Sequence, residues 1–473
     1  MGLYACLIAF TTCYIAARRS LIAGLLTTLA VGYVFGIVKA NTADTASYFV
    51  FDSAVLGLYA AQLFQPLTQA LKLRVEGLRG WMELLIFWPL IVFLIPTQDL
   101  FVRLVGLRTS IFLLPFLLIG ARLEPEQRYS LAVGLAALNL MALGFAVAEY
   151  FVGIPYFFPR NAVTKIIYMS KDVLGHTAFR IPATFANAHA FGGTMFLTVP
   201  LLAGAILQPR KKQWHLNLLA AGLAAAVLGV LMSATRLNFI AIALLLVVFT
   251  FSIKSRIAYA FGWVVIAGAI GLFAAGEARL QRVIEFQSTD YIKERIVGSV
   301  HMGFFDLAAT YPFGNGLGGG GSSIPQFLQD RVREPVVMEN EYARIMLEQG
   351  IFGLGLWVAF LVWLFTRRGK AGNDPWHHGR RLAWYACAIS FGTALLGTGL
   401  FVSVPGTCLL LISMGWIGAR QSTHSFAAEK QRSSTPRHPR IVETFFGWEK
   451  HRLPHLVRAL EGNATRHASE STS

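Results

Sequence analysis

Charged residues are scarce in this sequence, at 14% of 473 residues, and the acidic ones are scarcer than the basic ones, with 25 Asp and Glu against 41 Lys and Arg. Hydrophobic residues reach 55%, and the mean hydropathy is +0.55. No soluble domain of this size hides so much apolar sequence, so a soluble nucleic-acid binder is excluded despite the net charge of +16. Disordered and collagen-like classes are excluded by the same composition. A polytopic helical membrane protein remains, and in that class an excess of basic residues reports topology.

Cysteine is also scarce. Its four positions all fall inside apolar runs, where a free thiol behaves as a small hydrophobe, so a disulfide scaffold is not expected: Cys6, Cys13, Cys387 and Cys408. Five of the eleven histidines lie in the tail without metal-ligand spacing, and no Gly-Lys-Ser/Thr is present for a nucleotide P-loop. No basic residues precede the first apolar run, and Arg18-Arg19 stand where a cleavage site would be, so no cleavable signal peptide is predicted.

Long apolar runs are abundant. Since a helix needs roughly 20 apolar residues to cross a bilayer, the sequence predicts an all-α, polytopic bundle of about 12–13 transmembrane helices. The expected spans are 2–17, 21–38, 48–67, 81–97, 104–121, 130–154, 190–207, 216–234, 236–253, 257–276, 344–366, 382–400 and 404–419. Basic residues gather in alternate connections, such as 68–80 and 367–381, which the positive-inside rule assigns to the cytoplasm. The net charge then lies entirely on the cytoplasmic side, where the C-terminus is also expected.

Two connections on the opposite, outer side are long, at about 155–189 and 277–343. Long loops in compact proteins are usually functional or disordered. In the second loop, Ile292, Ile296, Val300 and Phe304 repeat every four residues, which predicts a helix on the outer membrane surface. Residues 1–419 are therefore expected to form one transmembrane domain, and the basic tail 420–473 to be cytoplasmic and largely disordered.

The polar residues of the spans lie mainly toward their outer ends. These residues are Asp52, Arg108, Glu149, Arg236 and Glu277. A transporter would place charges or broken helices near the midplane, whereas here the polar chemistry is expected at the outer face. Further polar groups enter the span at 344–366, where Glu341, Arg344 and Glu348 share one helical face. Because such a stripe is costly against lipid, it is expected to face a wet cavity.

A glycine-rich segment lies within the second outer loop. Gly314 to Gly319 fits GxGxxG, but neither the preceding strand nor the βαβ unit of a dinucleotide site is available in a helical membrane protein. A turn from Pro312 to Ser323 is the better interpretation. Its backbone N–H groups either bind an anion or serve only loop flexibility.

Several short motifs follow one another in a recognisable order. Arg180-Ile-Pro-Ala-Thr-Phe-Ala-Asn187 is followed by Ser233-Ala-Thr-Arg236 and then by Arg295. Tyr311-Pro-Phe-Gly-Asn-Gly-Leu-Gly318 and Glu339-Asn340-Glu341-Tyr342 come next, and then Glu348-Gln-Gly350-Ile-Phe-Gly353. The motifs span roughly residues 170–370. In their order, their expected side of the membrane and their spacing, they resemble the bacterial O-antigen ligase and polymerase superfamily.

The resemblance implies a metal-independent, inverting membrane glycosyltransferase without a cofactor. Its donor is an undecaprenyl-diphosphate-linked glycan, used at the periplasmic face of the bacterial inner membrane. Ligases transfer the glycan to lipid A–core, and polymerases transfer it to another lipid-linked repeat unit. Other polysaccharide assembly proteins are possible partners, and nucleic acid is not one.

The family's functional residues carry over motif by motif. Its arginines are thought to hold the diphosphate, which implies this role for Arg236 and Arg295, with Arg180 as a third candidate. Where the ligases carry a proposed catalytic histidine, this chain has Glu339, which favours a polymerase with a carboxylate as general base. The matching motifs also imply contacts to the substrate from Asn340, Tyr342, Arg344, Gly316 and Gly318.

Alternatives from other classes stay open. A transporter or flippase for lipid-linked sugars would explain the number of spans, and a non-catalytic scaffold for envelope assembly would explain the membrane topology. Within the enzyme hypothesis, His189 and His301 are alternative bases, although neither matches the motif. Arg236 has a simpler alternative role as an interfacial anchor, and Arg295 as part of a solvated charged face.

Overall fold

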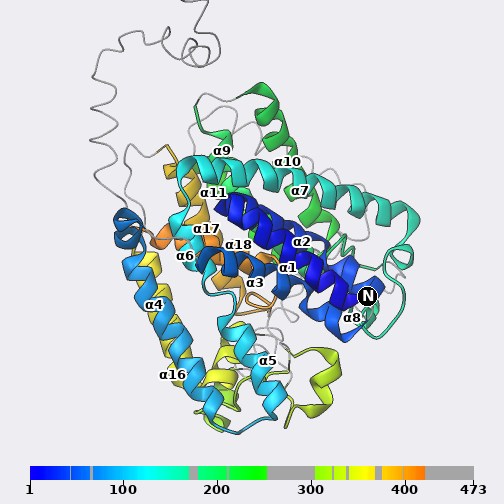
Figure 1. Ribbon diagram of the computed structural model, residues 1–473, viewed down its shortest axis with the longest axis vertical. Helices are drawn as coiled ribbons and strands as arrows, with labels where there is room; N and C mark the ends of the chain where they lie inside the picture. The colour runs from blue at the N-terminus through cyan, green and yellow to red at the C-terminus, as the bar shows by residue number, and fades with distance from the viewer. Residues whose placement is uncertain are drawn as a thin grey trace, which may run out of the picture. The chain divides into compact units, whose positions relative to one another are not determined.

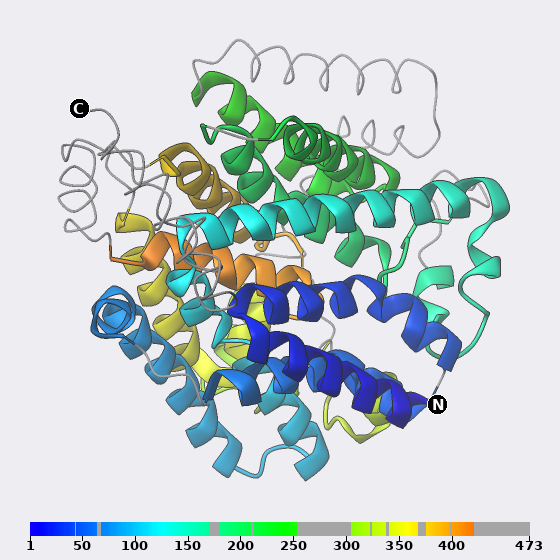
Figure 2. The same cartoon turned by 45° about the horizontal axis from the view of Figure 1, so that its top comes forward.

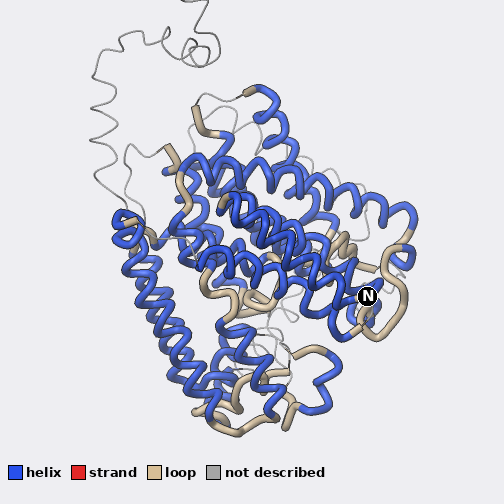
Figure 3. The backbone as a smooth tube through the Cα atoms, in the orientation of Figure 1, coloured by secondary structure: helices blue, strands red, loops and turns tan. Residues whose placement is uncertain are grey.

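The computed structural model describes residues 1–42, 44–63, 68–169, 179–209, 212–252, 304–321, 324–336, 340–367, 375–397 and 399–420. The chain divides into two units, Met1–Arg420 and Gln421–Ser473, and the described residues all belong to the first. Regular structure in them is helical, with no strand among the ranges just given (Figure 3). The all-helical prediction is therefore confirmed for this part of the chain. The expected span 257–276, the expected helix through Ile292 and the tail lie outside it.

The helices of the first half are α1 Gly2–Arg19, α2 Leu21–Thr42, η1 Thr45–Phe49, α3 Val50–Leu63, α4 Gln69–Leu94, α5 Leu100–Ile111, α6 Phe116–Arg122, α7 Pro125–Val152, η2 Ile154–Tyr156 and α8 Lys165–Met169 (Figure 1). Those of the second half are α9 Ala188–Ile206, α10 Gln213–Met232, α11 Arg236–Ser252, α15 Asp306–Thr310, η5 Gln326–Arg331, α16 Glu341–Thr366, α17 His377–Thr393 and α18 Gly406–Gly418. Each expected span within the described residues coincides with at least one of these helices.

Seven of the described segments are long and apolar enough to cross a membrane. They are α2, α4, the segment Leu100–Arg122 that comprises α5 and α6, α7, α9, α10 and α16. The helices α11 and α18 are apolar but shorter. A multi-pass membrane protein follows from the length and composition of these helices.

Three expected boundaries are corrected by the structure. The segment 68–80 is not a linker, because α4 begins at Gln69 and the Thr68 hydroxyl caps it by accepting from the N–H of Leu71. The expected span 104–121 is two helices, since Pro115, which has no N–H, lies in the turn between α5 and α6. The helix expected to reach residue 400 ends at Thr393, before a glycine-containing loop in which Gly399 has φ of 103°.

The interior of the bundle is built around α9 and α18. Every residue of α18 is buried, and this helix packs against α6, α9 and α17. It is drawn in orange and lies in the interior in both Figure 1 and Figure 2. Glycine permits the closest contact, because a Cβ on Gly120 of α6 would collide with the backbone of Ile412 in α18. Small residues at helix contacts are the usual means by which apolar helices approach within a membrane.

Candidate functional site

One cationic site forms where α9 begins. Asn187 caps this helix by accepting a hydrogen bond from the N–H of Ala190 at 2.8 Å. Next to the cap, Nη1 of Arg180 lies 2.8 Å from Nε2 of His189. A guanidinium has no acceptor, so Arg180 donates and the Nε2 of the imidazole accepts.

The short turn between α10 and α11 lies against the same end of α9. Asn238 of α11 donates from Nδ2 to the backbone oxygen of His189 at 3.4 Å. A Cβ on Gly192 of α9 would lie within 3 Å of both the Ser233 Oγ and the Asn238 Nδ2. Arg236 is the first residue of α11 and therefore lies near the start of α9, as Arg180 does.

Strained backbone accompanies both arginines. Among the described residues other than glycine, φ is positive at Ala183, Ala234 and Glu334. Two of these three are alanines in the arginine-bearing turns, Ala183 three residues after Arg180 and Ala234 two residues before Arg236. Left-handed alanine is unfavourable and persists where the surrounding structure requires it, which is characteristic of functional sites.

This arrangement is suited to an anion. The N-terminal ends of α9 and α11 each carry the partial positive charge of a helix dipole, and their first turns present N–H groups. Arg180 and Arg236 add guanidinium groups, whose planar donors match phosphate oxygens. Of the predicted diphosphate ligands, Arg180 and Arg236 thus belong to segments that lie against the same end of α9, and Arg295 lies outside the described residues.

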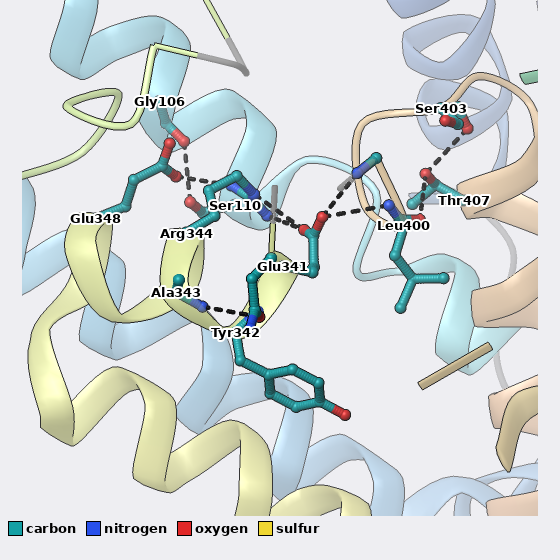
Figure 4. A network of polar contacts seen from close by, with 12 residues as sticks. Gly106, Ser110, Glu341, Tyr342, Ala343, Arg344, Glu348, Leu400, Ser403 and Thr407 are labelled. Atoms are coloured by element: carbon teal, nitrogen blue, oxygen red, sulfur yellow. Dashed lines mark hydrogen bonds and ion pairs between the residues drawn. The ribbon is translucent and has the colours of Figure 1, made fainter. Parts of the chain in front are cut away.

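A second polar cluster lies at the start of α16 (Figure 4). Nε and Nη2 of Arg344 bond to Oε1 of Glu341 at 2.9 and 2.5 Å, and Nη1 bonds to Oε2 of Glu348 at 2.8 Å. The three side chains are only 3%, 2% and 0% exposed, respectively. The expectation that they face a wet cavity is wrong. Protein encloses them, and the cavity beside Arg344 has a volume of about 20 Å³, room for one water molecule.

The neighbours of this cluster also serve the local fold. Asn340 caps α16, its Oδ1 accepting from the N–H groups of Tyr342 at 2.9 Å and Ala343 at 3.3 Å. The Tyr342 hydroxyl donates to the backbone oxygen of Phe391 in α17 at 2.9 Å. Glu339, the predicted base, lies outside the described residues, and it directly precedes this cap in the sequence.

Glu341 joins α16 to the loop before α18. Its Oε2 accepts from the N–H groups of Gly399 at 2.9 Å and Leu400 at 3.3 Å. Its own N–H donates to the backbone oxygen of Ala394 at 3.0 Å. One buried carboxylate therefore fixes both the start of α16 and the course of the loop that follows α17.

Helix α16 is broken at Gly350, whose φ of 70° and ψ of −179° are not helical. Groups freed by the break find partners outside the helix: Ile351 N–H donates to Pro312 O at 3.1 Å, and Leu347 O accepts from Asn315 N–H at 2.6 Å. Trp88 of α4 donates from Nε1 to Gln349 O at 2.8 Å. The three charges at the start of this span were expected from the sequence, whereas the break at Gly350 was not. Both features are tolerated because protein, rather than lipid, surrounds this half-helix.

The glycine-rich turn inserts into that break. Gly316 and Gly318 have φ of 86° and 79°, and a Cβ on them would collide with Thr97 and with Val102, respectively. Four backbone N–H groups of the turn donate to protein oxygens, at residues 314, 315, 319 and 321. Those four donors are committed to the fold and not to an anion.

Gln98, in the α4–α5 connection, holds this turn but was not predicted from the sequence; it is 2% exposed. Its Nε2 donates to the backbone oxygens of Asn315 at 3.0 Å and Arg333 at 3.1 Å, and its Oε1 accepts from the N–H of Arg333 at 2.8 Å. A lone glutamine between Thr97 and Asp99 has no pattern that distinguishes it from an ordinary loop residue.

Three other ionisable residues expected at the outer ends, Asp52, Arg108 and Glu149, are paired or buried, and Glu277 lies outside the described residues. Arg108 of α5 forms a bidentate ion pair with Asp52 of α3, with Nη2 within 2.6 Å of both carboxylate oxygens. Glu149 of α7 accepts from the N–H of Ala183 at 2.9 Å. No three His, Cys, Asp or Glu side chains of the described ranges are grouped so that they could hold a metal ion.

Comparison with known proteins leaves the chain without an assigned family. No protein-family model matches it, and no curated protein matches it. The fold defines an all-helical protein with several helices able to span a membrane, and its function is argued from the site.

Proposed function

We propose that this chain is a membrane glycosyltransferase that acts on undecaprenyl-diphosphate-linked oligosaccharide and polymerises O-antigen or exopolysaccharide repeat units. One observation carries the proposal: two arginine-bearing turns far apart in the sequence meet at the N-terminal ends of α9 and α11. The motif order described above supports it independently. The proposed location is the inner membrane of a bacterium, with the site at the periplasmic face and the C-terminus in the cytoplasm.

The proposed reaction is a single displacement with inversion. The acceptor hydroxyl attacks the anomeric carbon, the bond from that carbon to the diphosphate oxygen breaks, and undecaprenyl diphosphate leaves. Arg180, Arg236 and Arg295 stabilise the negative charge that develops on the departing diphosphate. Glu339 accepts the proton of the attacking hydroxyl. Arg344, held between two buried carboxylates, supports the segment that carries this base.

The same chemistry serves a ligase that uses lipid A–core as acceptor. The two activities are separated by incubating the purified protein in nanodiscs with lipid-linked oligosaccharide, with and without lipid A–core. Polymerase activity gives a ladder of products from the donor alone. Product that forms only when lipid A–core is added identifies a ligase and overturns the polymerase assignment.

The decisive variant is Arg236→Ala. Loss of one preorganised donor to the leaving group typically costs about 10²–10³-fold in rate, so glycan product should fall by about that factor at wild-type protein level. Arg331→Ala is the matched control, because Arg331 is an exposed arginine of η5 that stacks on Phe101. Normal product from Arg236→Ala at wild-type abundance would contradict the assignment.

A transporter or flippase for lipid-linked oligosaccharide is the second candidate. The break at Gly350 and the buried charges of the preceding half-helix favour it, because discontinuous helices often build transport sites. Protein reconstituted in vesicles would then move the lipid-linked oligosaccharide across the bilayer without forming glycosidic bonds. If variants of Arg236, Arg295 and Glu339 all retain normal glycan assembly in cells, a non-catalytic scaffold becomes the better assignment.

A further inference from the structure

Glu149 is a buried carboxyl group in the last turn of α7 with a single hydrogen-bond donor. Glu149 is buried, with only 2% of its surface exposed. Oε2 accepts from the backbone N–H of Ala183 at 2.9 Å, and no described residue supplies a partner to Oε1. Burying a carboxyl group that is so incompletely paired is unfavourable, so its presence at this position needs a physical explanation.

The residue that Glu149 holds is the strained position of a turn. Phe185 N–H donates to Pro182 O at 3.0 Å and closes a β-turn, in which Ala183 has φ of 51°. Alanine avoids this left-handed region because its Cβ crowds the backbone. The hydrogen bond from Ala183 to Glu149 stabilises the turn in that conformation.

A second contact fixes the turn from its other side. The backbone oxygen of Thr184 accepts from the N–H of Ile37 in α2 at 3.1 Å. A Cβ on Gly36 would collide with the backbone between Phe185 and Ala186, so α2 lies directly against the turn. The turn is thus held between α2 and α7, and Arg180 leaves it toward His189.

We propose that Glu149 is a positioning residue for the donor diphosphate. By holding Ala183, it fixes the turn that sets Arg180 beside His189 at the start of α9. This inference rests on the proposed role of Arg180 in binding the diphosphate. Since the task requires an acceptor oxygen and not a charge, glutamine at position 149 can perform it and leucine cannot.

The test compares Glu149→Gln with Glu149→Leu in nanodiscs, with kcat and KM measured for the lipid-linked donor. The glutamine variant should stay within about twofold of wild type. The leucine variant should raise the donor KM about tenfold or more, with a smaller effect on kcat, because misplaced binding groups weaken binding first. A KM within twofold of wild type for Glu149→Leu overturns the proposal, as does equal damage by Gln and Leu.

A second-site variant covers the case in which Glu149→Leu does not fold. Glycine adopts positive φ without strain, so adding Ala183→Gly should restore both accumulation and donor KM to within about threefold of wild type. Failure of the double variant to recover either quantity shows that Glu149 does not act through the turn, and overturns the proposal.

Two further readouts do not depend on glycosyl transfer. Hydrogen exchange of the Ala183 amide should be at least about tenfold faster in Glu149→Leu than in wild type or Glu149→Gln. Unchanged exchange would refute the stabilisation of the turn by Glu149. Undecaprenyl diphosphate should bind the leucine variant about tenfold more weakly than wild type. A wild-type protein that makes no glycan but shows this binding difference refutes the proposed reaction and supports the positioning role. Equal binding by the two proteins refutes the positioning role.

Discussion

Replacing Gly350 with alanine should destabilise the protein far more than the same replacement at an exposed glycine of α16. The break at this residue has φ of 70° and ψ of −179°. A Cβ added there would lie 2.8 Å from the backbone oxygen of Phe313 and 2.9 Å from its carbonyl carbon. Neither neighbour is the end of a flexible side chain, so the glycine-rich turn itself would have to move.

The magnitude has two parts. A residue other than glycine in this region of backbone space costs about 1–3 kcal/mol. Relief of the overlap with the Phe313 backbone adds about 1–3 kcal/mol, as for other overpacked sites. Gly350→Ala should therefore lower the free energy of unfolding by about 2–6 kcal/mol. The bonds from Asn315 to Leu347 and from Ile351 to Pro312 should weaken with it.

Gly355 provides a matched control in the same helix. It is exposed, and nothing lies within 4 Å of an added Cβ. Alanine in a helix interior is favoured over glycine by about 0.5–1 kcal/mol, so Gly355→Ala should be slightly stabilising. The assay is unfolding by sodium dodecyl sulfate in mixed micelles, followed by circular dichroism. Equal stability of the two variants would refute the assigned role of the break.

Three further outcomes are expected. Arg344→Leu leaves two buried carboxylates without their cation and should cost about 3–5 kcal/mol in the same unfolding assay, whereas a wild-type midpoint would contradict the buried ion-pair assignment. Gln98→Ala removes three partly buried hydrogen bonds to the backbone of Asn315 and Arg333 and should cost about 2–3 kcal/mol. Proteolysis between residues 304 and 336 should become faster, and unchanged cleavage would count against this role. The hydrogen bond from the Tyr311 phenol to the Glu334 carboxylate raises the Tyr311 pKa above its ordinary value of about 10. The bond is therefore intact below about pH 10 and is lost as the pH rises through the raised pKa. Ultraviolet titration, with Tyr311→Phe to identify the signal, should show a lower Tyr311 pKa in Glu334→Gln, and an unchanged value would exclude this cause.

The helical class and the positions of the helices were predictable because apolar runs are local signals. The apolar run at residues 190–207 predicts a helix without any knowledge of what packs against it, and α9 occupies Ala188–Ile206. Boundaries were less predictable where a helix continues beyond the apolar run. Residues 69–80 are polar enough to resemble a linker, yet the Thr68 cap starts α4 there.

For the candidate site, the sequence could select residues by motif but could not predict how they are arranged. Motif order selected Arg180 and Arg236, which the structure places at the same end of α9. The sequence could not show that Arg344 is enclosed, since burial depends on the loop before α18 and on α5. The contact between Glu149 and Ala183 joins distant segments through one hydrogen bond, and no repeating pattern in the sequence predicts it.

The complete burial of α18 has a consequence for how the protein is made. Residues 406–418 are the last of the described helices to be synthesised, yet they lie between α6, α9 and α17, which leave the ribosome earlier. Thirteen residues are also too few to cross a bilayer unaided, since a helix of that length spans about 20 Å. The contacts that α6, α9 and α17 make with α18 therefore cannot form until residues 406–418 have been synthesised. Truncation before Gly406 would remove the helix against which the buried faces of α6, α9 and α17 pack.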